Sequence, residues 1–287
     1  MKIALTGGSG FLGRELYKQL KAEGHECVLL LRETSVPPDN APCRRVDFKE
    51  GHAFKEALEG CEVLLHAVGV TNGSNEVLEE VNKILTTLLM TSLPDSIKRV
   101  VYISSAAAHM RKGPYGMAKL RAEEEVKTCG REWVLLRPTM IYGPGDNKNL
   151  AMMVDWVTKR FFVPVLGGGK FKVQPVHVED AAQACVAACT KEVSGSTFNV
   201  CGPEQISLKT MLEELKQRSK SSCIFISVPL KPVQIFLSFW AWLFPTTSLP
   251  VKQVKELDKH EAFEYTETSQ RLNYHPRRFQ DGLDWLN

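Results

Sequence analysis

Apolar residues in the first half of the chain alternate between two patterns. Six short runs have the length of buried strands, at residues 3–6, 27–31, 44–48, 62–67, 99–104 and 133–136. Uninterrupted runs, such as 27–31, are typical of parallel strands that are covered on both faces. Between them, one helical stretch begins near Phe11 and others span 52–59, 76–93 and 115–129. Because each parallel crossover needs a helix, the alternation predicts an α/β fold, a Rossmann-type doubly wound parallel sheet.

The pattern changes beyond residue 140. Helices are predicted at 149–159, 178–190 and 207–218, with isolated strands and several prolines between them. We therefore expect a Rossmann core over residues 1–145 and a smaller carboxyl-terminal substrate lobe over 146–287, with elements after residue 170 able to rejoin the core. In such sheets, ligands bind at the carboxyl ends of the strands.

One apolar arm, residues 232–250, belongs to neither pattern. Its centre, Ile235 to Phe244, consists of ten residues between two prolines. As a helix this centre would be about 15 Å long, roughly half of a bilayer core, so it cannot span a membrane. A helix that is apolar all round is usually buried or in an interface. Three roles stay open: a core or homodimer contact, the wall of a lipophilic substrate pocket, and association with a membrane surface.

Composition narrows the function classes. The net charge is only +3, and no basic run with interleaved aromatic residues points to a nucleic-acid surface. The eight cysteines are scattered and form no CxxC pair, so we expect reduced thiols, no metal site and a cytoplasmic location. Because the first strand begins at residue 2, we also expect no signal peptide.

Glycines occupy the junction between the first strand and the first helix, so that strand, glycine-rich turn and helix follow in order. Because glycine has no side chain, a pyrophosphate can approach the backbone closely, and the start of the helix offers free N–H groups and a positive dipole end. In this context the pattern Gly8-Ser-Gly-Phe-Leu-Gly13 predicts a dinucleotide site. Its residues would be Gly7, Gly10, Phe11, Leu12 and Gly13.

Two later strand ends bear on the cofactor. Arg32 closes the second strand, where a guanidinium suits the extra phosphate of NADP and an acidic residue suits NAD. Glu33 lies next to it, so NADP is the preferred prediction and NAD the alternative. Asp47, after the third strand, would either lie near the adenine edge or cap its own turn.

The fourth strand ends in His66-Ala67-Val68-Gly69. Ala67 and Val68 would let the cofactor backbone pass close by. His66 receives no functional role, because a histidine in such a place is more commonly buried and hydrogen-bonded.

A serine pair, Ser104-Ser105, ends the fifth strand, and Tyr115 and Lys119 follow one helical turn apart on one face. A phenol has a pKa of about 10, and a nearby ammonium lowers it, so Lys119 is expected to lower the pKa of Tyr115. Tyr115 would then be the general acid/base of a carbonyl–alcohol interconversion, with Ser105 holding the substrate oxygen. The alternative is an ordinary tyrosine and lysine on an exposed helix face.

These residues resemble the short-chain dehydrogenase/reductase superfamily, in particular its extended branch, the NAD-dependent epimerase/dehydratase family. The motifs follow the family's order over about residues 1–200: Thr6-Gly-Gly-Ser-Gly-Phe-Leu-Gly13, Ser105, Tyr115-x-x-x-Lys119, Arg137-Pro-Thr-Met-Ile-Tyr-Gly-Pro144, His177-Val-Glu-Asp-Ala-Ala182 and Thr197-Phe-Asn-Val-Cys-Gly202.

The resemblance implies roles for individual residues. The glycine turn would bind the pyrophosphate, and Lys119 would also bind the ribose. Ser105, Tyr115 and Lys119 match the catalytic triad, and Asn82 resembles the asparagine that often completes a tetrad. Pro138 leads into the segment that touches the nicotinamide side.

The segment before His177 departs from the family members that bind nucleotide sugars, which often carry an Arg-Asp pair there. This chain has Gln174-Pro175, which resembles the branch of the accessory subunit of respiratory complex I and its bacterial relatives. We therefore expect an NAD(P)-dependent oxidoreductase or epimerase acting on a small molecule, lipophilic if the arm lines its pocket. The alternative is a catalytically silent NADP(H)-binding structural or regulatory subunit.

Overall fold

The computed structural model describes residues 1–233 and 262–286. The chain divides into two compact units, of which unit 1 comprises Met1–Ile141, Val176–Cys201 and Glu264–Pro276. Unit 2 comprises Tyr142–Pro175, Gly202–Phe263 and Arg277–Asn287. The division thus falls at Ile141, near the expected residue 145, and two later segments return to the first unit. The centre of the apolar arm, Ile235 to Phe244, lies outside the described residues.

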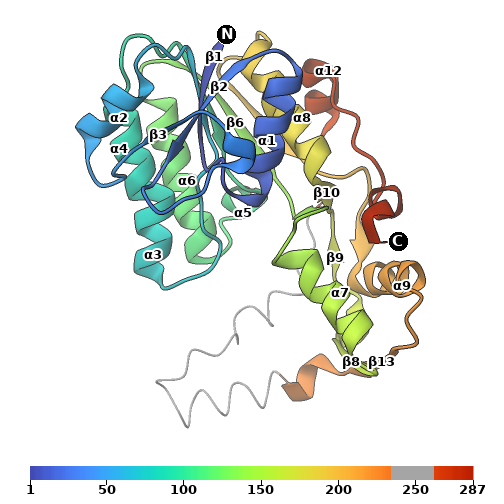
Figure 1. The fold of residues 1–287 in the computed structure, drawn as a ribbon. Helices are drawn as coiled ribbons and strands as arrows, with labels where there is room; N and C mark the ends of the chain where they lie inside the picture. Colours follow the sequence, from blue (N-terminus) through green and yellow to red (C-terminus); the bar gives the residue numbers. More distant parts are fainter. Residues whose placement is uncertain (234–261, 287) are drawn as a thin grey trace. The chain divides into compact units, whose positions relative to one another are not determined.

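Unit 1 is built on a parallel sheet of seven strands in the order β11-β6-β5-β4-β1-β2-β3 (Figure 1). The strands are β1 (Lys2–Thr6), β2 (Glu26–Leu31), β3 (Cys43–Arg45), β4 (Val63–His66), β5 (Arg99–Ile103), β6 (Glu132–Pro138) and β11 (Ser196–Val200). Strand β1 lies between β2 and β4, with Ile3 opposite Cys27 on one side and Val63 on the other. The predicted doubly wound parallel sheet is confirmed, although β3 is shorter than the predicted run at 44–48.

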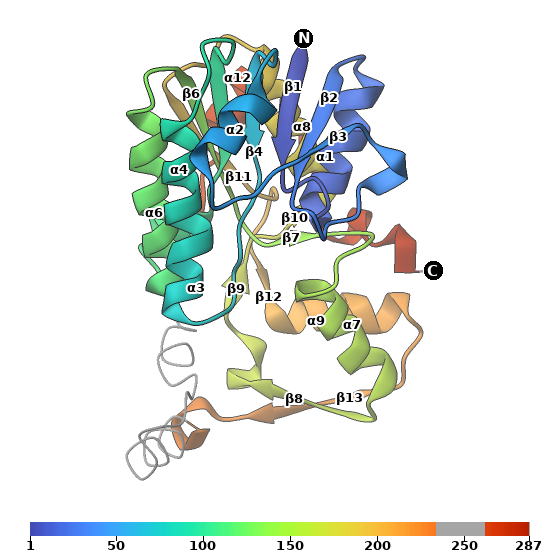
Figure 2. The same ribbon diagram turned by 60° about the vertical axis from the view of Figure 1, so that its left-hand side comes forward.

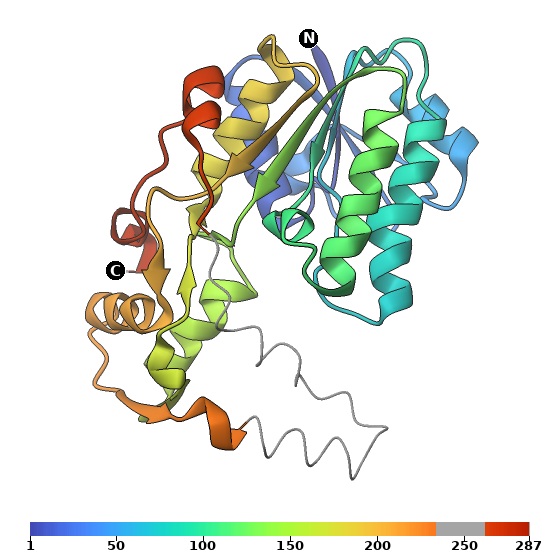
Figure 3. The same cartoon turned by 180° about the vertical axis from the view of Figure 1, so that it is seen from behind.

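Helices cover both faces of this sheet (Figures 1 and 3). One face carries α1 (Phe11–Ala22), α8 (Val178–Thr190) and α12 (Thr266–Leu272); the other carries α2 (Gly51–Leu58), α3 (Asn75–Glu79), α4 (Leu85–Thr91) and α6 (Gly113–Lys127). The apolar stripes expected from the sequence face inward, since Leu16 and Leu20 of α1 are fully buried. Each face therefore has its own apolar layer between sheet and helices.

The helix predicted at 76–93 is interrupted by a wider turn. Between α3 and α4, residues Glu80–Ile84 form a π-helical turn, in which the Leu85 N–H bonds to the Glu80 carbonyl five residues back. Such turns are rare and frequently occur at functional sites. This one holds Asn82, whose side chain is fully buried.

Among the residues that the structure describes, unit 2 includes two short two-stranded sheets and two helices of 11 residues each (Figure 2). Strands β8 (Phe162–Leu166) and β13 (Ile224–Val228) pair in parallel, and β9 (Lys172–Val173) pairs antiparallel with β12 (Ile206–Ser207). The helices are α7 (Asn149–Lys159) and α9 (Leu208–Arg218), both close to their predicted ranges. In the part of the chain that the structure describes, none of the helices combines the length and apolarity that a membrane crossing requires.

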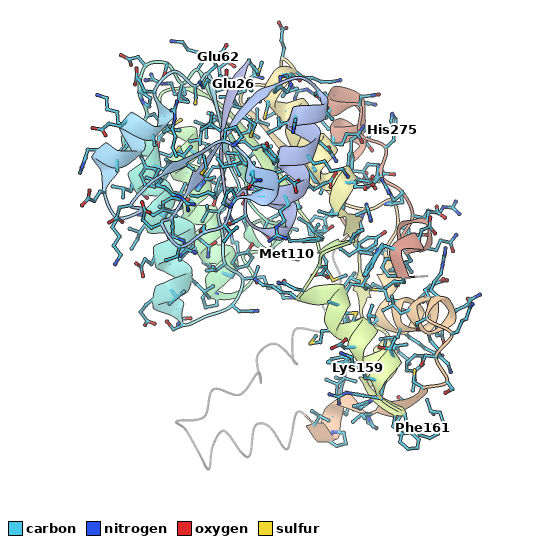
Figure 4. All side chains as sticks on the ribbon, viewed as in Figure 1. Glu26, Glu62, Met110, Lys159, Phe161 and His275 are labelled. Atoms are coloured by element: carbon cyan, nitrogen blue, oxygen red, sulfur yellow. The ribbon has the colours of Figure 1, made fainter. Side chains whose placement is uncertain are left out.

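The amino-terminal ends of the strands form one edge of the unit 1 sheet and their carboxyl-terminal ends form the opposite edge, and the two edges carry different residues. Figure 4 shows Glu26 and Glu62 at the amino-terminal edge, where the Lys2 amine pairs with Glu26 at 2.6 Å and its backbone N–H donates to Glu62 at 2.9 Å. Met110 marks the opposite edge, at the end of the short helix α5 (Ala106–His109). The carboxyl ends of the strands meet at that opposite edge, and the candidate site lies there.

Candidate active site

The glycine turn leaves no room for side chains. Gly7 has a φ of +76°, and a Cβ atom added there would lie 2.8 Å from the Ala67 backbone. A Cβ atom added at Gly13 would overlap the Gly7 carbonyl oxygen, which itself accepts a hydrogen bond from the Gly10 N–H at 2.9 Å. The turn is thus closed by contacts that only glycine permits.

Helix α1 starts directly after this turn with Gly10 at its cap position. No side chain among the described residues caps it, and its first turn contains no acidic residue. Phe11 and Leu12 are half-buried, and Leu12 packs against the apolar layer. Glycine backbone beside an uncapped, positively polarised helix start fits a dinucleotide pyrophosphate.

The loop after β2 is held by an arginine that the sequence reasoning overlooked. The Arg45 guanidinium donates to the carbonyl oxygens of Arg32 at 2.8 Å, Glu33 at 3.1 Å and Ser35 at 2.5 Å. Arg45 lies opposite Leu31 in the β2–β3 pair, which places it beside the loop. Arg32 itself is exposed at the end of β2, at the carboxyl edge of the sheet. The sequence signal for Arg45 was its place as a basic residue at the end of the next strand, β3.

The remaining predicted cofactor residues surround the same edge. Asp47 is exposed, and its carboxylate accepts the Lys49 N–H at 2.9 Å, which is the contact expected of a turn-capping aspartate; its place near the adenine stays a prediction. Ala67 contacts the glycine turn through its backbone, Val68 follows it half-buried, and Pro138 is buried at the end of β6.

Asn82 and Lys119 meet at Gly69. The Asn82 amide donates to the Val70 carbonyl at 2.9 Å and accepts the Val70 N–H at 3.1 Å, which fixes the segment after β4. A Cβ atom added to Gly69 would lie 3.0 Å from Asn82 Oδ1 and 3.3 Å from Lys119 Nζ. Two members of the predicted tetrad, from different helical elements, therefore lie around one glycine.

Lys119 is buried on α6, with only 2% of its surface exposed. Its amine donates to the Ile103 carbonyl at 2.8 Å and to the Tyr102 hydroxyl at 3.0 Å. Burial lowers the pKa of Lys119 to about 7, and the nearby Glu123 carboxylate opposes that shift. Tyr102 was not predicted as a site residue.

Ser105 and Tyr115 are brought together by the packing of α5 on α6. Ser105 caps α5, and its hydroxyl accepts the Ala107 N–H at 3.2 Å. The two helices approach so closely that a Cβ atom at Gly116 would overlap the Ala107 carbonyl. Tyr115, the neighbour of Gly116, is half-buried, and the Ser105 side chain is close enough to lower its pKa.

The expected effect of Lys119 on Tyr115 is wrong for this structure. Burial raises the pKa of Tyr115 instead of lowering it, and only the Ser105 side chain opposes that rise. The reason is geometric, since the Lys119 amine is directed toward Tyr102 and the Ile103 carbonyl.

A further buried group supports the same helix face. Glu123, one turn beyond Lys119, accepts two hydrogen bonds from Arg137 of β6, at 2.5 and 2.8 Å, and one from the Ser104 hydroxyl at 2.5 Å. Glu123 was not among the predicted site residues. The spacing of Tyr115, Lys119 and Glu123, with each member four positions after the one before, was a signal for it.

Comparison with known proteins agrees with this arrangement. The sequence profile of the NAD dependent epimerase/dehydratase family matches residues 3–201. A ceramide reductase of Caulobacter vibrioides is 29% identical over 199 residues, covering 67% of this chain and 62% of that enzyme. The 4-hydroxy-2-methyl-3-oxo-4-farnesyl-3,4-dihydroquinoline-1-oxide ketoreductase of Stigmatella aurantiaca is 25% identical, covering 100% of this chain and 96% of that enzyme. NADH dehydrogenase [ubiquinone] 1 alpha subcomplex subunit 9, mitochondrial, of Arabidopsis thaliana is 26% identical, covering 78% of this chain and 59% of that subunit.

Solved structures show the same fold. A crystal structure of the protein gox2253 superposes with a TM-score of 0.83 at 22% identity, covering 98% of this chain and 95% of that one. UDP-glucose 4-epimerase of Thermus thermophilus, in complex with NAD, gives a TM-score of 0.70 at 20% identity, covering 80% of this chain and 86% of that one. The chain spans 65% of the length of a Sinorhizobium fredii protein to which it is 29% identical. With its family profile, glycine turn and Rossmann-type sheet, the chain belongs to the NAD-dependent epimerase/dehydratase family, within the extended short-chain dehydrogenases/reductases.

Proposed function

We propose that this chain is an NADP-dependent oxidoreductase that reduces a ketone to a secondary alcohol, with Tyr115 as the general acid. The observation that carries the proposal is the convergence of Ser105, Tyr115, Lys119 and Asn82 at the carboxyl edge of the unit 1 sheet. Membership in a family named for NAD dependence supports a nicotinamide cofactor.

The cofactor assignment rests on the residues at the ends of β1 and β2. Gly7, Gly10 and Gly13 with the start of α1 would hold the pyrophosphate, and Arg32 would bind the 2′-phosphate of NADP. Structural relatives that were solved with a cofactor contain NAD, which makes NAD the alternative. When bound, the reduced nicotinamide supplies the hydride.

The protein's own part is to hold the carbonyl and to deliver a proton. Ser105 would donate a hydrogen bond to the substrate oxygen, and Tyr115 would transfer its proton to that oxygen as the carbonyl carbon is reduced. A phenol whose pKa is raised is protonated at neutral pH, and it is therefore prepared to act as an acid. This favours the reductive direction.

A lipophilic ketone is the proposed substrate class. Two of the relatives are reductases named for lipophilic molecules, a ceramide and a farnesyl-bearing quinoline oxide. Gln174 supports the departure from nucleotide sugars. Its amide nitrogen donates to the carbonyls of Gly202 at 2.8 Å and Phe263 at 3.1 Å, and its amide oxygen accepts the Phe263 N–H at 2.9 Å. The residue is buried and engaged by backbone in unit 2.

The test is turnover of a substrate panel of long-chain ketones, prenylated cyclic ketones and nucleotide sugars, each with NADPH and with NADH. We expect a lipophilic ketone to be reduced and Tyr115→Phe to lower kcat by about 100-fold or more, because proton transfer is lost. Tyr274→Phe is the matched control, since it removes a buried tyrosine hydroxyl that bonds to the Cys201 carbonyl. Undiminished turnover in Tyr115→Phe would contradict the mechanism.

A second function is favoured by one comparison. The similarity to the mitochondrial NADH dehydrogenase subunit supports a cofactor-holding structural or regulatory protein. That function predicts binding of NADP(H) without reduction of any member of the panel. Reduction of one ketone that depends on Tyr115 would exclude it.

A further inference from the structure

A continuous chain of buried polar side chains crosses unit 1 from the glycine turn to Lys119. Thr6, His66 and Tyr102 are neighbours in one row of the sheet, across β1, β4 and β5. The Thr6 hydroxyl lies 2.6 Å from His66 Nδ1, and His66 Nε2 lies 3.1 Å from the hydroxyl of Thr86 on α4. The His66 ring stacks on the Tyr102 ring, with centroids 5.4 Å apart, and the Tyr102 hydroxyl lies 3.0 Å from the Lys119 amine. None of the five residues is more than 2% exposed.

The Thr86 hydroxyl decides which way the hydrogens of this chain point. Its single hydrogen is donated to the Asn82 carbonyl, 2.9 Å away on the preceding helical turn. Thr86 can therefore only accept from His66. The Tyr102 hydroxyl oxygen accepts a hydrogen bond from the Lys119 amine. His66 carries its hydrogen on Nε2, and its Nδ1 accepts from Thr6; both assignments follow from the hydrogen-bond network.

Both hydrogen-bond partners of the Lys119 amine are thus acceptors. One is the Tyr102 hydroxyl oxygen and the other is the Ile103 carbonyl, at 2.8 Å. The amine also lies 4.5 Å from the centre of the Tyr102 ring, within the range of a cation–π contact. An ammonium has three hydrogens and no lone pair, whereas a neutral amine would also need a donor. These surroundings select the charged form of a side chain that burial would otherwise discharge.

We propose that Tyr102 is a positioning residue for Lys119, which it holds as an ammonium beside Gly69 and Asn82. The proposal rests on the function proposed above, in which Lys119 belongs to the catalytic set. Through the stacked His66 ring and its hydrogen bond with Thr6, the same tyrosine is connected to the strand end that precedes the glycine turn. The glycine turn and the lysine are therefore linked by one row of buried, contacting side chains.

The other ionisable groups near Lys119 leave this role to Tyr102. On α6 itself, Tyr115 and Glu123 lie one turn to either side, and Arg137 of β6 is paired with Glu123. On β4, burial and Lys119 lower the pKa of His66 to about 3, so His66 is neutral. The exposed charges of the π-helical turn, α3 and α6 pair with one another: Lys83 with Glu125, and Arg121 with Glu79.

Tyr102→Phe tests the proposal because it keeps the ring and removes only the acceptor. The charge of Lys119 is followed by ¹⁵N NMR of lysine-labelled protein over a pH titration, with Lys119→Met to assign the signal. We expect Tyr102→Phe to lower the titration midpoint of Lys119 by about one pH unit, which is a roughly tenfold lower proton affinity. Tyr274→Phe is the matched control, because its buried hydroxyl bonds to a carbonyl at 2.8 Å away from any ammonium, and the midpoint should not move.

Thr86→Val serves as a second variant if Tyr102→Phe is poorly folded. It keeps the Tyr102 hydroxyl but removes a side chain that lowers the pKa of Tyr102, so a smaller shift in the same direction is expected. With an active substrate, the alkaline limb of kcat/KM should move to lower pH in step with the Lys119 midpoint. An unmoved or raised midpoint in these variants overturns the proposal. Absence of turnover in the unmodified chain would overturn the proposed function instead, and the NMR titration would still decide the role of Tyr102.

Discussion

Glu123 on α6 and Arg137 on β6 form a bidentate ion pair beneath the helix face that carries Tyr115 and Lys119. Its two N–O distances are 2.5 and 2.8 Å. The Glu123 side chain is fully buried and that of Arg137 is 16% exposed. The pair joins the end of β6 to the helix that follows β5. Lys119 is therefore anchored from two sides, by Tyr102 in the sheet and by the charge of Glu123 in its own helix.

Glu123→Ala should destabilise the protein strongly. It leaves the Arg137 guanidinium and the Ser104 hydroxyl without their buried acceptor, a loss of about 3 kcal/mol in the free energy of unfolding. Denaturant titration measures it. The control is Glu124→Ala, one residue along the same helix, whose pair with Lys127 is on the surface. Loss of that pair should cost less than about 1 kcal/mol. Equal losses in the two variants would contradict the structural role of the buried pair.

Gly13→Ala should disable the cofactor site. The new methyl group would overlap the Gly7 carbonyl oxygen and push the turn away from its closed geometry. We expect the Kd for the cofactor to rise at least about tenfold, or ~1.4 kcal/mol of binding free energy, in a fluorescence titration. Gly130→Ala is the control, since Gly130 also has a positive φ, of +72°, but its Cβ would meet open space. The control should lose some stability and keep its cofactor affinity.

Arg32→Ala should separate the two cofactors. Removal of a guanidinium that binds the 2′-phosphate would weaken the binding of NADPH by about 1.5–3 kcal/mol and leave the binding of NADH nearly unchanged. Arg45→Ala should weaken both, because it releases three carbonyls of the loop that carries Arg32. Calorimetric titration of each variant with each cofactor distinguishes the two effects. If Arg32→Ala weakens NADH and NADPH to the same degree, the arginine does not discriminate between them.

His66 should make the fold sensitive to acid. Its pKa in the folded state is lowered to about 3, below its value in an unfolded chain, so the unfolded state binds the proton more readily between those values. The contribution of His66 to the free energy of unfolding is fully present above about pH 6.5. It falls as the pH is lowered toward 3, by up to about 1.4 kcal/mol per pH unit. His66→Gln should flatten that part of the stability profile in urea titrations. His275→Gln, at the exposed histidine labelled in Figure 4, should leave it steep.

Much of the fold and half of the site followed from local sequence. The strand, glycine turn and helix at residues 2–22 and the four-residue spacing of Tyr115 and Lys119 are patterns within one or two elements. Local backbone preference and helix periodicity determine such patterns, so they can be predicted without knowledge of distant contacts. The pKa of Tyr115 could not be predicted in this way, because its direction depends on burial and on where the Lys119 amine points.

The sequence by itself determined the parallel Rossmann-type sheet and the glycine turn, and it predicted the candidate catalytic set. The tertiary structure decided which side chains surround that set. The row Thr6, His66, Tyr102 exists because β1, β4 and β5 pair in one particular register, although its members are separated by 60 and 36 residues in the chain. Strand register is chosen by packing against both helical layers and not by the residues of any single strand. Tyr102, Glu123 and Arg45 thus acquire their roles only when distant elements meet.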